Sequence, residues 1–180
     1  MKKIKVKLKG LSPLLMNNPA SMIDDVGGKL KDKTSKIDMK ASAEKLAYKT
    51  DKGELYIPAE AIKGSLIGAS SYKKIGKYSA RPIIAGGVHI SPRFVLLGTK
   101  EYDLDIRTVV IQRNRVVKAR PLIDNWECEF ELMYDETLIA DAEFIKPILE
   151  EAGKRVGLLD FRPQKTGSFG MFEVVKWEEE

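Results

Sequence analysis

Cysteines, histidines and long apolar runs are scarce in this chain of 180 residues, and each shortage excludes a class of protein. The single cysteine, Cys128, excludes an internal disulfide and a zinc site built from cysteines. The single histidine, His89, excludes a histidine-rich metal site. No apolar run is long enough to span a membrane, and the N-terminal residues alternate where a signal peptide would be continuously apolar. We therefore expect a cytoplasmic protein without a membrane partner.

The abundant residues indicate a folded domain with a net positive charge. Hydrophobic residues make up 43% of the chain and charged residues 32%, which is typical of a globular protein with a buried core. The length predicts a single domain over residues 1–180, with insertions at about 17–50 and 77–123. The net charge of +5 favours polyanionic partners over cationic ones.

Strict alternation predicts two central strands. In "KIKVKLK", residues 3–9, the apolar side chains share one face and the lysines share the other. In "WECEFEL", residues 126–132, the apolar side chains again share one face and the glutamates the other. "GMFEVVKW", residues 170–177, predicts the last strand, and the acidic residues after it are expected to form a solvated tail.

Helical periodicity predicts two principal helices, over about 58–76 and 141–157. Pro147 must either kink the second helix or mark a fresh start after a turn. A shorter helix is expected over 39–48, and the two apolar runs in 81–97 predict an inserted hairpin.

The predicted order of principal elements is strand, helix, strand, strand, helix, strand. That order predicts an α+β fold with a ferredoxin-like (RRM-like) βαββαβ core. In this topology the first and third strands are antiparallel neighbours, which places the lysines of residues 3–9 beside the glutamates of residues 126–132. Ion pairs across the strands explain this pattern better than a nucleic-acid-binding sheet face, because the outward positions have no aromatic residues on which bases could stack.

Two basic segments favour contact with phosphates. "RTVVIQRNRVVKAR", residues 107–120, predicts two strands that meet near Arg113 and Asn114, the second interrupted by Pro121. It contains no acidic residue, so its charges repel one another locally; a merely solvated hairpin is the alternative. "SYKKIGKYSAR", residues 71–81, mixes cations with two tyrosines, as segments that bind single strands do. The cations of the two segments are Arg107, Arg113, Arg115, Lys118 and Arg120, and Lys73, Lys74, Lys77 and Arg81.

A glycine-rich loop is expected between the second helix and the last strand, over residues 157–170. Its glycines predict a close approach of the backbone to a ligand, its cations add positive charge and its phenylalanines add flat apolar surface. The alternative is a long loop closed by packing of the phenylalanines. No phosphate-loop NTPase motif is present. The residues concerned are Gly157, Phe161, Arg162, Lys165, Gly167, Phe169 and Gly170.

Three stretches together resemble the RAMP superfamily. They are "LSPLLMNN" after the first strand, "LYIPAEAIKGSLIGAS" at the first helix and the glycine-rich loop. In the second stretch Pro58, Lys63 and Gly64 match the spacing of the family pattern. Members of this superfamily include the RNA-binding backbone subunits of CRISPR effector complexes and CRISPR RNA processing endonucleases. The resemblance implies that RNA is held by the glycine-rich loop and by a thumb-like hairpin, which here is the basic segment near Arg113.

Combined with the basic segments, the resemblance predicts a protein that binds single-stranded nucleic acid, most directly a CRISPR-type guide RNA. It would act as a repeating backbone subunit of a ribonucleoprotein filament in antiviral defence, with other effector-complex subunits as partners and without a cofactor. The residues predicted to contact nucleic acid are Lys63, Lys73, Lys74, Lys77, Arg81, Arg107, Arg113, Arg115, Lys118, Arg120, Phe161, Arg162, Lys165, Gly167, Phe169 and Gly170.

Two alternatives remain open from the sequence. The first is a metal-dependent RAMP endoribonuclease, in which Asp24 or Asp25 would recruit Mg²⁺ or His89 would act as general acid or base. A pair of adjacent carboxylates is common in loops, and a lone histidine beside a glycine pair is more often structural, so the sequence favours binding over catalysis. The second alternative is a virus-encoded single-stranded DNA-binding or structural assembly protein that reuses the fold.

Overall fold

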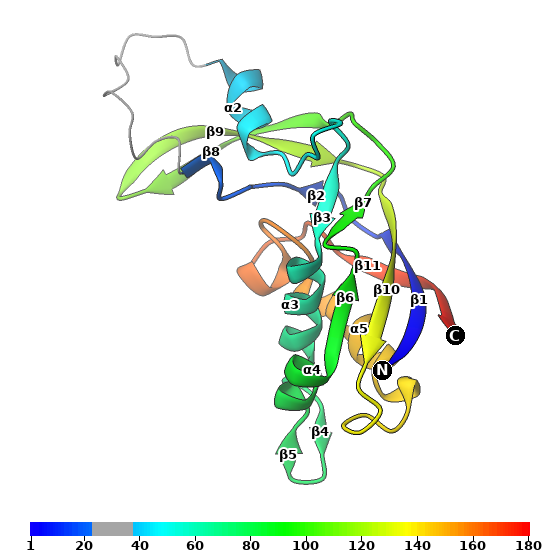
Figure 1. The fold of residues 1–180 in the computed structure, drawn as a ribbon. Helices are drawn as coiled ribbons and strands as arrows, with labels where there is room; N and C mark the ends of the chain where they lie inside the picture. The colour runs from blue at the N-terminus through cyan, green and yellow to red at the C-terminus, as the bar shows by residue number, and fades with distance from the viewer. Residues whose placement is uncertain (23–37) are drawn as a thin grey trace.

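The core is a four-stranded antiparallel sheet, seen in a computed structural model that describes residues 1–22 and 38–180 (Figure 1). Its strands, in spatial order, are β11 (Phe172–Glu179), β1 (Lys2–Gly10), β10 (Glu127–Tyr134) and β6 (Val88–Ser91). Every neighbouring pair is antiparallel. The two strands predicted from alternation, β1 and β10, are therefore central neighbours, as expected.

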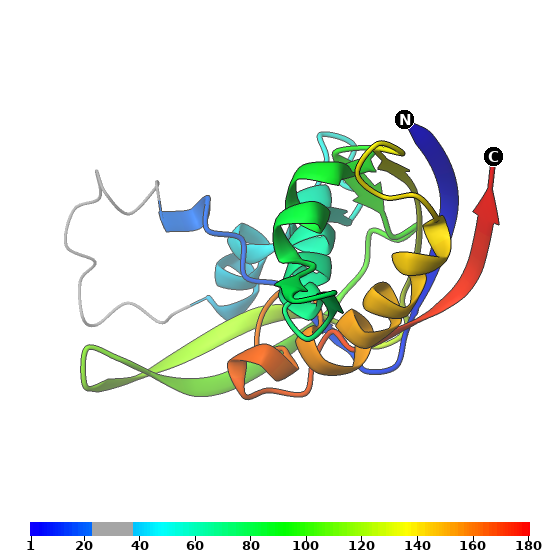
Figure 2. The same cartoon turned by 90° about the horizontal axis from the view of Figure 1, so that it is seen from below.

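One face of this sheet is buried beneath helices. The inward side chains of β1 and β10 have exposed fractions of 4% or less; they are Ile4, Val6, Leu8, Cys128, Phe130, Leu132 and Tyr134. The face is covered by α3 (Ala59–Ser70) and by α5 (Lys146–Glu151), which continues into a π-helical turn at Ala152–Val156 (Figure 2). The burial of apolar side chains between helices and sheet is the main stabilising term of such a layer. The mixed α+β class is confirmed.

The other face carries the predicted ladder of lysines and glutamates. Lys7 Nζ lies 2.8 Å from Glu127 Oε2, and Lys3 Nζ lies 3.3 Å from Glu131 Oε2. The C-terminal acidic residues join the ladder instead of forming a solvated tail, because β11 extends to Glu179 and Glu180 pairs with Lys5 at 2.5 Å. Cross-strand pairing is thus confirmed, and the solvated tail is a wrong prediction.

The first principal helix is shorter than its periodicity predicted. It ends at Ser70, and the chain then forms a small hairpin from β4 (Lys74–Ile75) and β5 (Tyr78–Ser79). Gly76 adopts a φ of 60° in the turn, a backbone conformation that glycine allows at no steric cost.

The inserted hairpin predicted over 81–97 is wrong. Residues Arg81–Gly87 form α4, because Pro82 suits the first turn of a helix. The next residues form β6 of the core sheet, and β7 (Phe94–Leu96) pairs with β3 (Tyr56–Pro58) in a separate ribbon.

The second principal helix makes a fresh start at Lys146, with Pro147 in its first turn, which is one of the two expected alternatives. A 3₁₀ turn at Ala142–Phe144 precedes α5, and Pro147 occupies the first turn of α5. The π-helical turn that follows contains Gly153, where a Cβ atom would overlap the carbonyl oxygen of Phe172. The helix and the last strand therefore approach more closely than any other residue would permit.

A long hairpin projects from one end of the core (Figures 1 and 2). It consists of β8 (Asp103–Ile111) and β9 (Asn114–Ile123), and β2 (Leu14–Leu15) pairs with β9 at its base. The turn is Gln112–Arg113, one residue before the expected position, and both residues have positive φ values, of 47° and 67°, as a tight two-residue hairpin turn requires.

Pro121 does not interrupt β9. It lies opposite Leu104 in the ladder, and its carbonyl oxygen accepts a hydrogen bond from the Met16 N–H at 2.9 Å. The short expected helix is present as α2 (Met39–Leu46), which packs against β9. Within the described residues, no helix has the length and apolar character needed to cross a membrane.

Candidate nucleic-acid interface

The glycine-rich loop is closed by two backbone hydrogen bonds of its own and by a third to Pro13. The Leu158 N–H donates to the carbonyl of Gly170, the Phe169 N–H to that of Phe161, and the Gly170 N–H to that of Pro13, at 2.8 to 3.2 Å. The rings of Phe161 and Phe169 pack with their centroids 6.0 Å apart. A loop closed by its phenylalanines was the expected alternative, and the structure has that form.

The glycines of this loop make close internal contacts possible. A Cβ atom on Gly167 would overlap the carbonyl oxygen of Phe161, and one on Gly170 would overlap that of Leu158. At Gly157 the Cβ atom would lie 2.7 Å from Pro163 Cδ. The loop's own backbone therefore requires these glycines, which is a different reason from the approach of a ligand predicted from the sequence.

A buried arginine joins the loop to the basic hairpin. Arg120 of β9 is 6% exposed, and its Nη1 and Nη2 atoms lie 2.9 Å from Asp160 Oδ2 and 3.3 Å from Asp105 Oδ2. Arg107 Nε lies 2.7 Å from Asp105 Oδ1, and its guanidinium carbon lies 5.0 Å from the centre of the Phe169 ring. The predicted uncompensated repulsion is therefore wrong for these two arginines, because Asp105 and Asp160 balance them.

A cleft of about 370 Å³ opens where the loop meets the first turns of α3. The lining residues are Asn17, Tyr48, Glu60, Ala61, Gly64, Ser65, Gly157, Leu159, Asp160 and Arg162. A Cβ atom on Gly64 would meet no atom within 4 Å, so this glycine widens the cleft without being needed for packing. Ser65 is 3% exposed, and its hydroxyl has no hydrogen-bond partner among the described residues.

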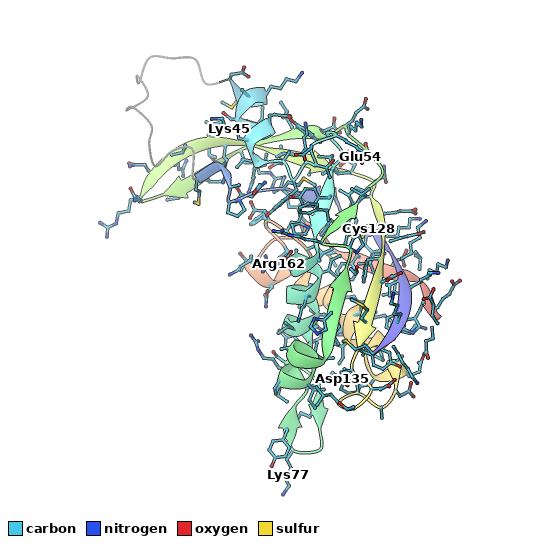
Figure 3. The ribbon with its side chains drawn as sticks, viewed as in Figure 1. Lys45, Glu54, Lys77, Cys128, Asp135 and Arg162 are labelled. Carbon is cyan, nitrogen blue, oxygen red and sulfur yellow. The ribbon has the colours of Figure 1, made fainter. Side chains whose placement is uncertain are left out.

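One cation, Arg162, lines this cleft, and a second, Lys118, is hydrogen-bonded to the lining residue Asn17. The Arg162 Nη1 group donates to the Leu159 carbonyl oxygen at 2.9 Å and Nη2 to Gln164 Oε1 at 3.2 Å, so the guanidinium is fixed in place. Figure 3 shows Arg162 beneath the base of the hairpin. Lys118 Nζ donates to Asn17 Oδ1 at 2.9 Å. Burial lowers the pKa of Lys118 from its usual value, although the nearby Asp160 carboxylate opposes this shift.

The other predicted cations lie in four places. Arg113 and Arg115 are exposed at the hairpin tip, Lys165 is exposed in a 3₁₀ turn of the loop (Pro163–Lys165), and Lys63 precedes Gly64 on α3. The cluster on the β4–β5 hairpin lies at the opposite end of α3, where Figure 3 labels Lys77. The structure thus brings the hairpin base, the loop and the start of α3 together, and it places Lys73, Lys74, Lys77 and Arg81 elsewhere.

Several cleft residues were not singled out from the sequence. Asn17 belongs to the stretch "LSPLLMNN", whose resemblance had marked it, but the individual residue carried no signal. Tyr48, Ser65 and Asp160 are common residue types, and only the tertiary contacts bring them to one surface.

Of the candidates for catalysis, only His89 lies within the described residues, and it does not line the cleft. Asp24 and Asp25 lie outside the described residues. His89 is exposed on β6, opposite Met133, on the sheet face turned away from α3. In residues 1–22 and 38–180, no group of three or more His, Cys, Asp or Glu side chains is arranged to hold a metal ion.

Comparisons with known proteins give a fold similarity. No family model matches the sequence, and no curated protein matches it. The structure is similar to a chain in the cryo-EM structure of the Type III-B Cmr-beta bound to cognate target RNA, with a TM-score of 0.66 and 17% identity over 99% of this chain. The match covers 60% of that chain, so this chain spans less than two thirds of its length.

A second match is a chain of a CRISPR RNA-guided surveillance complex. Its TM-score is 0.37 at 10% identity, over 94% of this chain and 66% of that chain. This similarity is too low to compare the folds. The first match shows that this chain has a fold like that of a chain in the Cmr-beta structure.

Proposed function

We propose that this protein binds single-stranded nucleic acid, RNA in the first instance, as a RAMP-type subunit of a CRISPR ribonucleoprotein complex. The observation that carries the proposal is the cleft that Arg162 of the glycine-rich loop lines together with Asn17, to which Lys118 of β9 donates a hydrogen bond. Fixed cations beside a narrow cleft suit a phosphate backbone, because the arginine fork and the lysine ammonium both pair with phosphate oxygens.

The start of α3 adds to this site. Pro58 precedes the helix and provides no side-chain cap. The Ala59 N–H donates to the Arg93 carbonyl oxygen, and the next N–H groups of α3 have no partner within residues 1–22 and 38–180, so they can meet an anion. The positive end of a helix attracts phosphate. The unpartnered Ser65 hydroxyl could donate to a ligand in the same cleft.

The fold supports the assignment to a RAMP-type, ferredoxin-like core. The sheet order β11-β1-β10-β6 with two crossing helices is the order expected of a split βαβ unit. The projecting β8–β9 hairpin lies where the resemblance predicted a thumb. A repeating arrangement of subunits along the RNA, with other effector subunits at its ends, is part of this proposal.

The test is the salt dependence of binding to a single-stranded RNA. Affinity should fall steeply between about 50 mM and 200 mM salt, and each phosphate contact removed should reduce the slope of log affinity against log salt by about 0.7. We expect Arg162→Gln with Lys118→Met to weaken binding to all sequences and to reduce the slope by about 1.4.

The matched control removes the same charge from the sheet face. Lys5 and Lys7 pair with Glu180 and Glu127 on that face, away from the cleft, so Lys5→Gln with Lys7→Gln should bind like the parent. If both double variants lost the same affinity for RNA, binding would depend on the net charge of the protein and not on the cleft. A parent protein that binds no single strand at low salt would refute the proposed function.

A further inference from the structure

A row of aromatic rings leads away from the cleft over the β3–β7 ribbon. Tyr48, which lines the cleft, meets Tyr56 edge-on with ring centroids 5.7 Å apart. Tyr56 meets Phe94 with centroids 4.5 Å apart, and the guanidinium carbon of Arg93 lies 5.3 Å from the centre of the Phe94 ring. Rings and guanidinium thus form one continuous surface that begins at the cleft.

The ribbon turns this surface outward. Ile57 and Val95 point into the core and are fully buried, whereas Phe94 and Leu96 are 42% and 44% exposed. Arg93 is exposed as well. The core is therefore complete without the outward side chains, and a large ring at Phe94 is left partly in contact with solvent.

The chemistry of the row fits unpaired nucleobases. Bases of single strands stack on aromatic rings and on the planes of arginine guanidinium groups, and this stacking tolerates any sequence. Burial raises the pKa of Tyr48 and of Tyr56, so both rings remain uncharged at neutral pH and do not repel a polyanion. The cation of Arg93 adds attraction for the strand.

We propose that Phe94 and Arg93 form a stacking site for an unpaired base of a strand whose backbone occupies the cleft. This inference rests on the proposed function. It adds to that function the position at which a base of the bound strand lies, outside the cleft that holds the sugar-phosphate backbone. Tyr56 and Phe94 are too close for a base to insert between them, so the base stacks on the outer surface of Phe94 or on the free plane of the Arg93 guanidinium. Tyr48 and Tyr56 position these two side chains and connect them to the cleft.

The test uses single-stranded RNA that contains one 2-aminopurine, a base whose fluorescence is quenched by stacking. Binding to the parent should quench the probe at one or more positions along the strand. Phe94→Ala should relieve the quenching and weaken binding by about 5-fold to 150-fold, the range measured for loss of one stacked base. Because no charge is removed, the salt slope should stay that of the parent.

Two further variants keep the test decisive if Phe94→Ala loses its fold. Arg93→Gln changes an exposed side chain and should relieve quenching while also reducing the salt slope. Val175→Ala, which shortens a side chain 46% exposed on the edge strand β11, is the matched control and should bind and quench like the parent.

The outcomes separate this inference from the function on which it rests. If Phe94→Ala and Arg93→Gln quench and bind like the parent while the Arg162 and Lys118 variant is weakened, the stacking site is refuted and the proposed function stands. If the parent itself binds no single strand, both fail. If the parent self-associates in sedimentation and Phe94→Ala abolishes only that association, the row is an interface between copies of this chain.

Discussion

Arg120 of β9 and Asp160 of the glycine-rich loop form an ion pair, with 2.9 Å between Nη1 and Oδ2, that joins two segments 40 residues apart in the sequence. Arg120 also pairs with Asp105 of the neighbouring strand β8. Both the arginine and Asp105 are nearly inaccessible, with 7% of each side chain exposed. This triad holds the base of the hairpin against the loop, and the cleft lies beside it.

The triad should be essential to stability. Removal of one partner of a buried ion pair leaves the other charge unpaired and costs about 3 to 5 kcal/mol. We expect that loss for Arg120→Ala and for Asp105→Asn. Asp160 is 28% exposed, so water compensates in part, and Asp160→Asn should cost about 1 kcal/mol. Urea unfolding measures all three.

The control for the triad is Arg113→Gln at the exposed hairpin tip, which should unfold at the same urea concentration as the parent. Equal stability of Arg120→Ala and Arg113→Gln would show that the buried triad does not hold the hairpin in place.

Gly167→Val should destabilise the protein instead of merely obstructing a ligand. The new side chain would overlap the Phe161 carbonyl oxygen, and the hydrogen bond from the Gly167 N–H to the Arg162 carbonyl oxygen, at 3.1 Å, would have to break. We expect a loss of about 2 kcal/mol or more, seen as a lower melting temperature. If the variant had the parent's melting temperature and bound RNA more weakly, Gly167 would face the ligand, as the sequence predicted.

Lys118→Met should stabilise the protein at neutral pH and weaken RNA binding. Burial disfavours the charged ammonium, so the folded-state pKa lies below the unfolded-state value of about 10.5. Between those two values the unfolded chain binds more protons, and the stability of the parent therefore rises with pH relative to the variant. The advantage of Lys118→Met in unfolding free energy should shrink as pH rises toward the unfolded-state pKa of about 10.5.

The matching measurement is urea unfolding of parent and variant at each pH. An advantage that grows with pH would mean that the lysine is better solvated in the folded state than in the unfolded chain, which contradicts its burial.

Local patterns predicted the strands and helices that depend on nearby residues. The alternation in residues 3–9 and 126–132 is a local property, and both segments became central strands. Pro147 likewise acts through its own backbone, and it lies in the first turn of α5, which begins at Lys146. The strand β6 was missed because it is only four residues long and is defined by its pairing with β10, far along the chain.

The candidate site could be predicted only in part for the same reason. The basic hairpin and the glycine-rich loop were found as separate segments, each from its composition. That Arg120 is buried between two aspartates depends on Asp160, which is distant in sequence. The role of the loop glycines depends on contacts such as that between Gly170 and Leu158, which no sequence pattern reveals.

The central claim is that a strand runs through the cleft between α3 and the glycine-rich loop, and Gly64→Leu tests it most directly. A Cβ atom there would meet no atom within 4 Å, and the substitution changes no charge and should raise helix stability by about 0.5 to 1 kcal/mol. We predict that it melts no lower than the parent yet binds single-stranded RNA at least about tenfold more weakly in fluorescence anisotropy. The matched control is Gly86→Leu in α4, where a Cβ atom also meets nothing, and it should bind like the parent. A folded Gly64→Leu protein with the parent's affinity would contradict the account.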